Sequence, residues 1–474
     1  MSAAGTADPL DALRTRLGPG RLLTGDAQLA PYLVDFRKLY QGRALGVALP
    51  QSVAEVQAIV AWCAAHRIGL VPQGGNTGYV GGATPDESGR QLVLALRGLN
   101  RIRSVDAGNF SMTVEAGCVL ATVQAAATDA DRFFPLSLGS EGSCQIGGNL
   151  ATNAGGLNVV RFGMTRDLVL GIEAVMPDGR LFEGLGSLRK DNTGYDLKSL
   201  LIGSEGTLGV ITAATLKLWP RMRTTATAFV AIADVAAAVN LLGRLRAAAG
   251  ERLNSFELIP RIGVELTTRH ISGVVDPLDQ PCPWYLLCEL ASATAEPLEE
   301  LLQQVLGEAI AAGVVLDAAL AQNERQRLAF WRLRESIPEA QRLAGPSLKH
   351  DISVPVMALP GFVAEASAWV RQHVPEGVLV SYGHAGDGNL HFNINQLAGQ
   401  DAAAFMAREP QIRRAIHDLV RQHHGSISAE HGIGRLKAGE LARYADPVEL
   451  DAMRAIKRAL DPLGIMNPGK MLQS

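Results

Sequence analysis

The chain has 474 residues and a formal net charge of −3, with 47% hydrophobic and 19% charged residues. This length exceeds what one hydrophobic core usually supports, so we expect two or three domains. The slightly negative charge argues against non-specific binding to nucleic acid. Five cysteines without a Cys-x-x-Cys pair indicate reduced thiols. The sequence therefore predicts a cytoplasmic protein without a signal peptide or a membrane span.

The first glycine cluster, Pro72-Gln-Gly-Gly-Asn-Thr-Gly-Tyr-Val-Gly-Gly82, follows an expected helix from Ser52 and a short strand at 68–71. Its spacing does not match the Gly-x-Gly-x-x-Gly of a Rossmann fold, and the residues after it are typical of a turn. We interpret it as a loop whose backbone N–H groups hold a pyrophosphate. A mobile surface loop is the alternative.

A second glycine-rich stretch, residues 134–156, follows expected strands at 92–96 and 111–115 and a helix at 119–128. It carries almost no charge and is rich in glycine, threonine and asparagine. Such a stretch suits neither a core nor a solvated loop, and it favours a sheath around an extended cofactor. The first half ends with a third cluster, Gly203-Ser-Glu-Gly-Thr-Leu-Gly209, and a strand that leads to Pro220.

Residues 221–425 alternate between expected strands and helices. Two strand–helix–strand halves predict an α+β domain with helices on one face of an antiparallel sheet. A C-terminal segment, 426–474, follows and contains one more helix. The predicted domains are therefore 1–220, 221–425 and 426–474.

A hairpin is predicted in the second domain at Ser381-Tyr-Gly-His-Ala-Gly-Asp-Gly-Asn-Leu-His-Phe-Asn393, with its turn at Asp387-Gly388. A two-residue turn there would place His384 directly opposite His391 on one face of the sheet. Asn393 would lie on the same face, because strand side chains alternate. Two imidazoles so placed can share one metal ion.

A third metal ligand is expected downstream, in Ser428-Ala-Glu-His-Gly-Ile-Gly434, where Glu430 stands beside a histidine in a glycine-rich turn. The hypothesis is a metal site of two histidines and one glutamate with open coordination positions. One alternative is a polar hairpin whose histidines bond to the backbone. Another is a hydrolytic zinc site, in which the glycine loops would hold a nucleotide substrate.

Taken in order, these motifs resemble FAD-linked oxidoreductases of the vanillyl-alcohol-oxidase (PCMH-type) superfamily, in the D-2-hydroxyglutarate and D-lactate dehydrogenase branch. The resemblance covers about residues 40–474. It implies an α+β fold: a PCMH-type FAD-binding domain of two α+β subdomains, and an antiparallel-sheet α+β substrate domain that caps the flavin. The motifs that carry it are Pro72–Gly78, Gly142–Asn149, Thr152–Gly156, Gly203–Gly209, Gly383–His391, Ser428–Gly432 and Asn467–Lys470.

The resemblance implies noncovalent FAD, because Asn76 stands where relatives with covalent flavin carry a histidine. It assigns residues from all three glycine clusters and from the C-terminus to FAD. These residues are Pro72, Gly74, Gly75, Asn76, Thr77, Gly78, Ser143, Gly147, Gly148, Thr152, Asn153, Gly155, Gly156, Glu205, Gly206, Val210 and Asn467.

The resemblance also implies a divalent metal on His384, His391 and Glu430, with zinc as first choice and manganese as an alternative. His431 matches the base beside the flavin, and Asn393 matches an asparagine that contacts the substrate.

Arg334 and Lys349 match an arginine and a lysine that hold a distal carboxylate in the hydroxyglutarate branch. The alternative interpretation is that Arg334 and Lys349 are ordinary charged side chains on the protein surface. Pro338 departs from this branch, which can carry a threonine there, and this departure weakens the assignment because proline donates no hydrogen bond.

The implied reaction is oxidation of D-2-hydroxyglutarate to 2-oxoglutarate, with hydride transfer to flavin N5. D-lactate or another apolar D-2-hydroxy acid is the alternative substrate, and an inactive flavin-binding scaffold is a further alternative function. The expected partners are the hydroxy acid and an electron acceptor such as an electron-transfer flavoprotein or a quinone. The protein could assemble as a homodimer.

Overall fold

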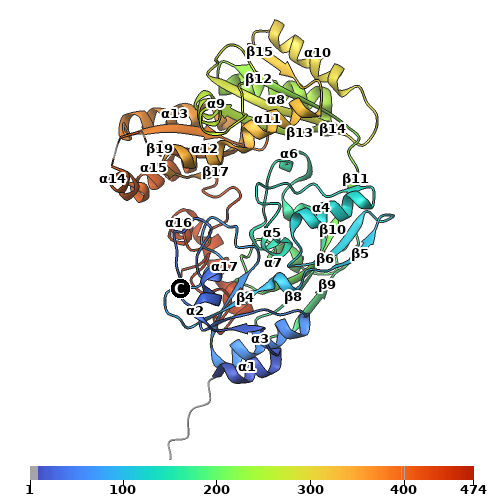
Figure 1. Ribbon diagram of the computed structural model, residues 1–474, viewed down its shortest axis with the longest axis vertical. Helices are drawn as coiled ribbons and strands as arrows, with labels where there is room; N and C mark the ends of the chain where they lie inside the picture. The colour runs from blue at the N-terminus through green and yellow to red at the C-terminus, as the bar shows by residue number, and fades with distance from the viewer. Residues whose placement is uncertain (1–8, 397, 400, 474) are drawn as a thin grey trace, which may run out of the picture. The chain divides into compact units, whose positions relative to one another are not determined.

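The computed structural model describes residues 9–396, 398–399 and 401–473 (Figure 1). The chain forms two compact units, and each is built from segments that are far apart in the sequence. Unit 1 comprises Met1–Ala154, Met164–Pro220 and His431–Ser474, and unit 2 comprises Gly155–Gly163 and Arg221–Glu430. Among the described residues, no helix is both long and apolar enough to span a membrane.

Unit 1 contains a four-stranded sheet in the order β1-β2-β4-β3, in which β2, β4 and β3 are parallel. The strands are β1 (Leu22–Leu23), β2 (Gly46–Ala48), β3 (Gly69–Gln73) and β4 (Gln91–Ala95). Helix α3 (Val53–His66) packs on this sheet through Val56, Ile59 and Cys63, which are fully buried. Ser52 caps the helix by accepting a hydrogen bond from the Glu55 N–H at 3.3 Å, as its sequence predicts.

A five-stranded antiparallel sheet completes the strand framework of unit 1, in the order β5-β6-β10-β8-β9. Its strands are β5 (Ile102–Asp106), β6 (Ser111–Glu115), β8 (Val169–Val175), β9 (Leu181–Gly184) and β10 (Val210–Lys217). A short ladder joins β7 (Arg132–Phe133) to β11 (Trp219–Pro220). The other helices of unit 1 are α1 (Pro9–Leu17), α2 (Asp26–Leu29), α4 (Leu120–Asp129), α5 (Ile146–Thr152), α7 (Leu197–Leu201), α16 (Ala438–Tyr444) and α17 (Pro447–Leu460).

The C-terminal segment returns to the parallel sheet of unit 1. Met466 forms a parallel bridge with Leu70 of β3. The Leu70 N–H donates to the Ile465 carbonyl at 2.7 Å, and the Asn467 N–H donates to the Leu70 carbonyl at 2.8 Å. The last residues of the chain therefore extend a sheet that its first hundred residues begin.

Unit 2 contains two antiparallel sheets (Figure 1). The first has the order β13-β14-β12-β15, with β12 (Thr224–Ile232), β13 (Leu253–Pro260), β14 (Trp284–Ser292) and β15 (Asp317–Leu320). The second has the order β16-β19-β17 with β18 also paired to β19, and its strands are β16 (Ser347–Leu348), β17 (Asp351–Ser353), β18 (Gly377–Tyr382) and β19 (Asn389–Gln396).

The helices of unit 2 cover both faces of the first sheet, so the predicted arrangement with helices on one face is wrong. Nearly every residue of β12, β13 and β14 is buried, because α8 and α10 pack on the sheet and α9, α11 and α12 share a second apolar core with it. The helices are α6 (Val159–Phe162), α8 (Val235–Ala249), α9 (Arg261–His270), α10 (Leu298–Ala311), α11 (Glu324–Glu335), α12 (Ile337–Ala344), α13 (Leu359–His373), α14 (Ala402–Ala407) and α15 (Glu409–Gln422).

The β18–β19 hairpin forms, but its predicted two-residue turn is wrong. Tyr382, not His384, pairs with His391. The chain leaves the ladder after Tyr382 because Gly383 pairs instead with Leu258 of β13, through hydrogen bonds of 3.0 and 2.8 Å in the two directions. Pairing between the two sheets therefore overrides the local turn signal at Asp387-Gly388.

Candidate active site

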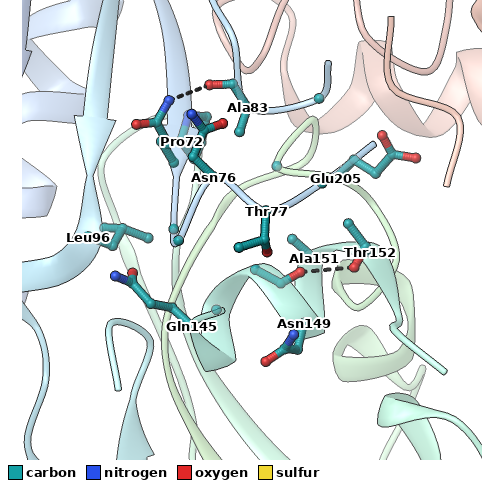
Figure 2. A pocket seen from close by; sticks show the side chains of 18 of the residues that line it. Pro72, Asn76, Thr77, Ala83, Leu96, Gln145, Asn149, Ala151, Thr152 and Glu205 are labelled. Carbon is teal, nitrogen blue, oxygen red and sulfur yellow. Dashed lines mark hydrogen bonds between the residues drawn. The ribbon is translucent and has the colours of Figure 1, made fainter. Parts of the chain in front are cut away.

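A pocket in unit 1 is lined by the three glycine-rich segments identified in the sequence. In Figure 2, Thr77 of the first loop lies opposite Ala151 of helix α5, and Glu205 of the third cluster lies on the same rim. The predicted cofactor residues that line this pocket are Pro72, Gly74, Gly75, Asn76, Thr77, Gly78, Gly147, Gly148, Thr152, Glu205, Gly206 and Val210.

The walls of this pocket fit an extended polar ligand. Gln145 Oε1, Asn149 Oδ1 and Thr84 Oγ1 line it and are buried without a hydrogen-bond partner among the described residues. Buried polar atoms are normally paired, so these three require partners that the protein does not supply. A Cβ added at Gly78 or Gly148 would meet no atom within 4 Å. The absent side chains therefore leave the backbone open to a ligand, as FAD binding requires.

The predicted cofactor residues Ser143, Asn153 and Asn467 lie beside this pocket rather than in its wall. The Ser143 carbonyl lies 2.2 Å from where a Cβ of Gly75 would stand, so only glycine fits at Gly75. Asn153 ends helix α5 in the left-handed conformation and accepts a hydrogen bond from the Arg166 N–H at 2.8 Å. Asn467 donates to the carbonyls of Gly82 and Glu205 at 2.9 and 2.7 Å.

Several lining residues are absent from the sequence prediction. Gln145 and Asn149 stand inside the quoted motif Gly142–Asn149, of which only Ser143, Gly147 and Gly148 were assigned to the cofactor. Their polar side chains in an otherwise uncharged stretch are a signal that could have identified them. Asp35 also lines the pocket, but no motif surrounds it.

His431 lines the same pocket of unit 1. Its ring makes an edge contact with Tyr79, with 4.6 Å between centroids and an interplanar angle of 89°. The turn that follows is tied to the pocket wall, because the buried Glu205 carboxylate accepts hydrogen bonds from the Ile433 and Gly434 N–H groups, both at 2.7 Å. Burial raises the pKa of Glu205, although these two donors and the nearby lysine oppose the shift. The structure thus fixes the backbone beside His431.

The three predicted metal ligands lie together in unit 2. His384 Nε2 is 3.7 Å and His391 Nε2 is 4.0 Å from Glu430 Oε2, and the two imidazole centroids are 5.5 Å apart. An ion held tetrahedrally by nitrogen and oxygen ligands separates those ligand atoms by roughly 3.3–3.4 Å. The two separations from Glu430 Oε2 are only slightly wider, so each histidine lies close enough to share a divalent cation with Glu430.

Asp351 joins this cluster and was not predicted. It lies directly opposite His391 in the β17–β19 ladder, and its carboxylate is within 4.8 Å of the ligand atoms of His391 and Glu430. Its two oxygens accept hydrogen bonds from the Glu430 N–H at 3.0 Å and from Asn389 Nδ2 at 3.1 Å. Asp351 can therefore orient Glu430 or serve as a further oxygen ligand.

The predicted cofactor residues Gly155 and Gly156 belong to unit 2, where they contact Glu430. The Gly156 N–H donates to Glu430 Oε1 at 2.5 Å. A Cβ on Gly155 would lie 2.5 Å from the same oxygen. This close approach leaves Glu430 Oε2 directed toward the two histidines.

The charges in the cluster follow from burial and from neighbouring groups. Burial opposes the charged form of His384, but Glu257 and Glu430 outweigh it and raise its pKa well above the usual value. Burial lowers the pKa of His391 to about 3 against the attraction of Glu430. Burial opposes ionisation of Glu430, but the histidines hold its pKa at about 2. His391 and Glu430 are therefore in the uncharged and ionised forms that bind metal, whereas His384 has to release a proton when a cation binds.

The predicted substrate residues also lie in unit 2. Arg334 is buried, and its Nε donates to Glu257 Oε2 at 2.9 Å. Asn393 is buried, donates to Gln341 Oε1 at 3.1 Å and accepts from the His350 N–H at 3.3 Å. Lys349 is half-buried between β16 and β17.

Two parts of this chain match known protein families. Residues 44–184 match the FAD binding domain, and residues 221–471 match the C-terminal domain of FAD linked oxidases. The chain belongs to the FAD-linked oxidase family. This confirms the predicted family and an FAD-dependent oxidoreductase.

The FAD-linked oxidase is similar along its whole length to curated relatives named D-2-hydroxyglutarate dehydrogenase. It is 40% identical to the Bos taurus mitochondrial protein, over 98% of this chain and 83% of the relative. It is 37% identical to the Arabidopsis thaliana mitochondrial protein, over 96% and 80%. It is 36% identical to the Stutzerimonas stutzeri protein, over 98% of each. These relatives place it in the D-2-hydroxyglutarate dehydrogenase branch.

A solved structure supports the fold of this FAD-linked oxidase. p-Cresol methylhydroxylase with substrate bound superposes with a TM-score of 0.77 at 17% identity, over 98% of this chain and 96% of the other. At that identity the likeness concerns the fold alone. The predicted PCMH-type α+β fold class is confirmed.

Proposed function

We propose that this FAD-linked oxidase converts a D-2-hydroxy acid, with D-2-hydroxyglutarate as first choice, to the 2-keto acid, and that it requires a divalent metal. One observation carries the proposal. His384, His391 and Glu430 cluster in unit 2, and Glu430 directly precedes His431 in the sequence. His431 lines the glycine-rich pocket of unit 1. The names of the relatives support the choice of substrate.

His384, His391 and Glu430 would hold the metal, and the pocket of unit 1 would hold FAD. When bound, FAD accepts a hydride from the substrate, and the metal acts as a Lewis acid on the substrate hydroxyl. His431 takes the proton of the C2 hydroxyl on an imidazole nitrogen. Tyr79 and the turn held by Glu205 keep that imidazole in place.

Anaerobic mixing with D-2-hydroxyglutarate tests this function. Purified protein should show flavin absorption near 450 nm, an approximate expectation for an oxidised flavin. The substrate should bleach that absorption, and chelator-treated protein should keep it. A flavoprotein that neither D-2-hydroxyglutarate nor any other D-2-hydroxy acid bleaches would contradict the proposal.

A second substrate class is favoured by the pair between Arg334 and Glu257. The carboxylate neutralises the arginine, so a distal substrate carboxylate would have to compete with a contact of 2.7 Å. Pro338 also offers no hydroxyl donor there. Both observations favour an uncharged substrate tail, as in D-lactate.

Substrate preference should distinguish the two classes. If Lys349 binds a distal carboxylate, that charged contact contributes roughly 1.5–3 kcal/mol, or about 10- to 150-fold in kcat/KM. Wild-type protein should then prefer D-2-hydroxyglutarate over D-lactate by that factor, and Lys349→Met should remove the preference while Lys349→Arg retains part of it. Equal kcat/KM values for the two acids in wild type would support the apolar class.

Arg334→Ala is a poorer test of substrate preference. Removing one partner of a buried ion pair typically costs about 3–5 kcal/mol of stability. The variant would leave Glu257 buried without its arginine, which would destabilise the protein. A loss of activity in this variant would therefore not show whether Arg334 binds the substrate.

Noncovalent binding predicts that the flavin is released intact by acid. Asn76 offers no nucleophilic ring nitrogen, and its amide donates to the Val34 carbonyl at 2.9 Å. After precipitation with acid, flavin fluorescence should stay in the supernatant. Fluorescence that remains with the washed protein pellet would show a covalent link.

A further inference from the structure

A single buried carboxylate connects a proposed metal ligand to a proposed substrate residue in unit 2. Glu257 lies in the middle of β13, and its side chain is 1% exposed. Its Oε1 lies 2.7 Å from His384 Nδ1. Its Oε2 lies 2.9 Å from Arg334 Nε and 2.7 Å from Arg334 Nη2. No motif identified in the sequence includes this residue.

We infer that Glu257 is the positioning residue that makes His384 a metal ligand. A carboxylate bound to Nδ1 requires a proton on that nitrogen, which leaves the Nε2 lone pair free. Nε2 is the nitrogen that lies 3.7 Å from Glu430 Oε2. A carboxylate that holds a ligand histidine in this way fixes the ring orientation and increases its basicity. The inference rests on the metal dependence proposed above.

Arg334 explains how this carboxylate stays charged inside the protein. A buried carboxylate needs hydrogen bonds or an opposite charge, and Arg334 supplies both, with Nε 2.9 Å and Nη2 2.7 Å from Glu257 Oε2. The arginine is held in turn by the ring of Tyr382, with 4.8 Å between the guanidinium carbon and the ring centroid. Arg334 thus holds the carboxylate that positions His384, in addition to any contact that it makes with a substrate.

Arg334 keeps unused hydrogen-bonding capacity in this arrangement. Its Nη2 is buried, and although it is close to Glu257 Oε2, the two atoms are too poorly aligned to form a hydrogen bond. The directed hydrogen bond to Glu257 is therefore the one from Nε, and Nη2 contributes its charge at 2.7 Å from the same oxygen.

The alternative is that Glu257 only stabilises the fold, as buried ion pairs often do. Unit 2 offers a matched control for this alternative. Glu289 of the adjacent strand β14 is also buried and paired with an arginine, at 3.1 Å from Arg327 Nη1. It accepts further hydrogen bonds from Trp331 Nε1 and Thr227 Oγ1, and none from the metal-site histidines. Loss of Glu289 should therefore affect stability alone.

The test is Zn²⁺ affinity, measured by competition with a chromophoric chelator on flavin-loaded, metal-stripped protein. Glu257→Gln should bind Zn²⁺ about 10–100-fold more weakly than wild type, the range for residues that orient a metal-bound histidine. Glu289→Gln should bind Zn²⁺ as wild type does, and both variants should keep their flavin.

The double variant Glu257→Gln/Arg334→Gln separates the loss of the carboxylate from the burial of an unpaired arginine. It should fold, because two amides can bond to each other, and it should still show weakened Zn²⁺ binding. Wild-type affinity in the double variant would overturn the inference, as would equal weakening in Glu257→Gln and Glu289→Gln. Failure of wild type itself to bind Zn²⁺ or another divalent ion would overturn the proposed metal dependence, and this inference with it.

Discussion

Glu430→Ala should lose the divalent metal and, with it, turnover. Glu430 is the proposed anionic ligand, and its Oε2 faces both His384 and His391. Alanine would remove the carboxylate that faces both imidazoles and leave Asp351 as the remaining carboxylate of the cluster. We therefore expect metal affinity to fall by more than the roughly 10–100-fold that is typical for residues which only orient a ligand.

Metal content and flavin content should be measured on the same preparation. Flavin should stay bound, because its pocket is built from residues of unit 1 and Glu430 belongs to unit 2. Glu339→Ala is the control, since Glu339 is exposed on helix α12 and, among the described residues, pairs only with Arg342, at 2.7 Å. Joint loss of metal and flavin in the Glu430 variant would mean that the two sites are not separable.

His431→Ala should slow flavin reduction by roughly 10²–10⁴-fold, the usual contribution of a positioned base. Stopped-flow mixing with D-2-hydroxyglutarate under anaerobic conditions measures this step directly. The metal should remain, because His431 is not among the three proposed ligands. His66→Ala is the control, since His66 belongs to the same unit and stacks on Trp62.

Added imidazole provides a second readout for His431. Replacing His431 by alanine removes the imidazole ring and leaves a space near Tyr79. A small base from solution can occupy that space. Imidazole should therefore restore part of the reduction rate in His431→Ala and have no effect on wild type. A reduction rate within a few-fold of wild type in the variant would exclude His431 from the chemistry.

The sequence predicts the parts of the site that depend on local composition. Glycine clusters mark the pocket because a chain that approaches a ligand closely needs residues without side chains. His384, His391 and Glu430 were predicted as metal ligands because two histidines stand near a strong turn and a Glu-His pair follows downstream. The turn itself was wrong, and the histidines meet because the β18–β19 connection is wide enough to bring His384 back toward His391.

Contacts over long sequence distances were not predictable. Glu257 and His384 are 127 positions apart, and nothing in the sequence joins them. The single charged residue of the strand Leu253–Pro260 was the available signal, since a buried charge needs a partner. Asp351 could be placed opposite His391 only from the ladder. The boundaries of the three predicted domains, the cytoplasmic location and the electron acceptor stay predictions.

The interleaving of the two units has a consequence for biosynthesis. Unit 1 needs Ile465–Asn467 to complete the hydrogen bonds of β3, and these residues are translated long after Leu70. At synthesis rates of about 5–20 residues per second, roughly 12–50 s separate Pro220 from Ile465. During that interval the edge of β3 at Leu70 is exposed on the ribosome. A nascent chain of this protein should therefore depend on chaperones until Ile465–Asn467 emerge.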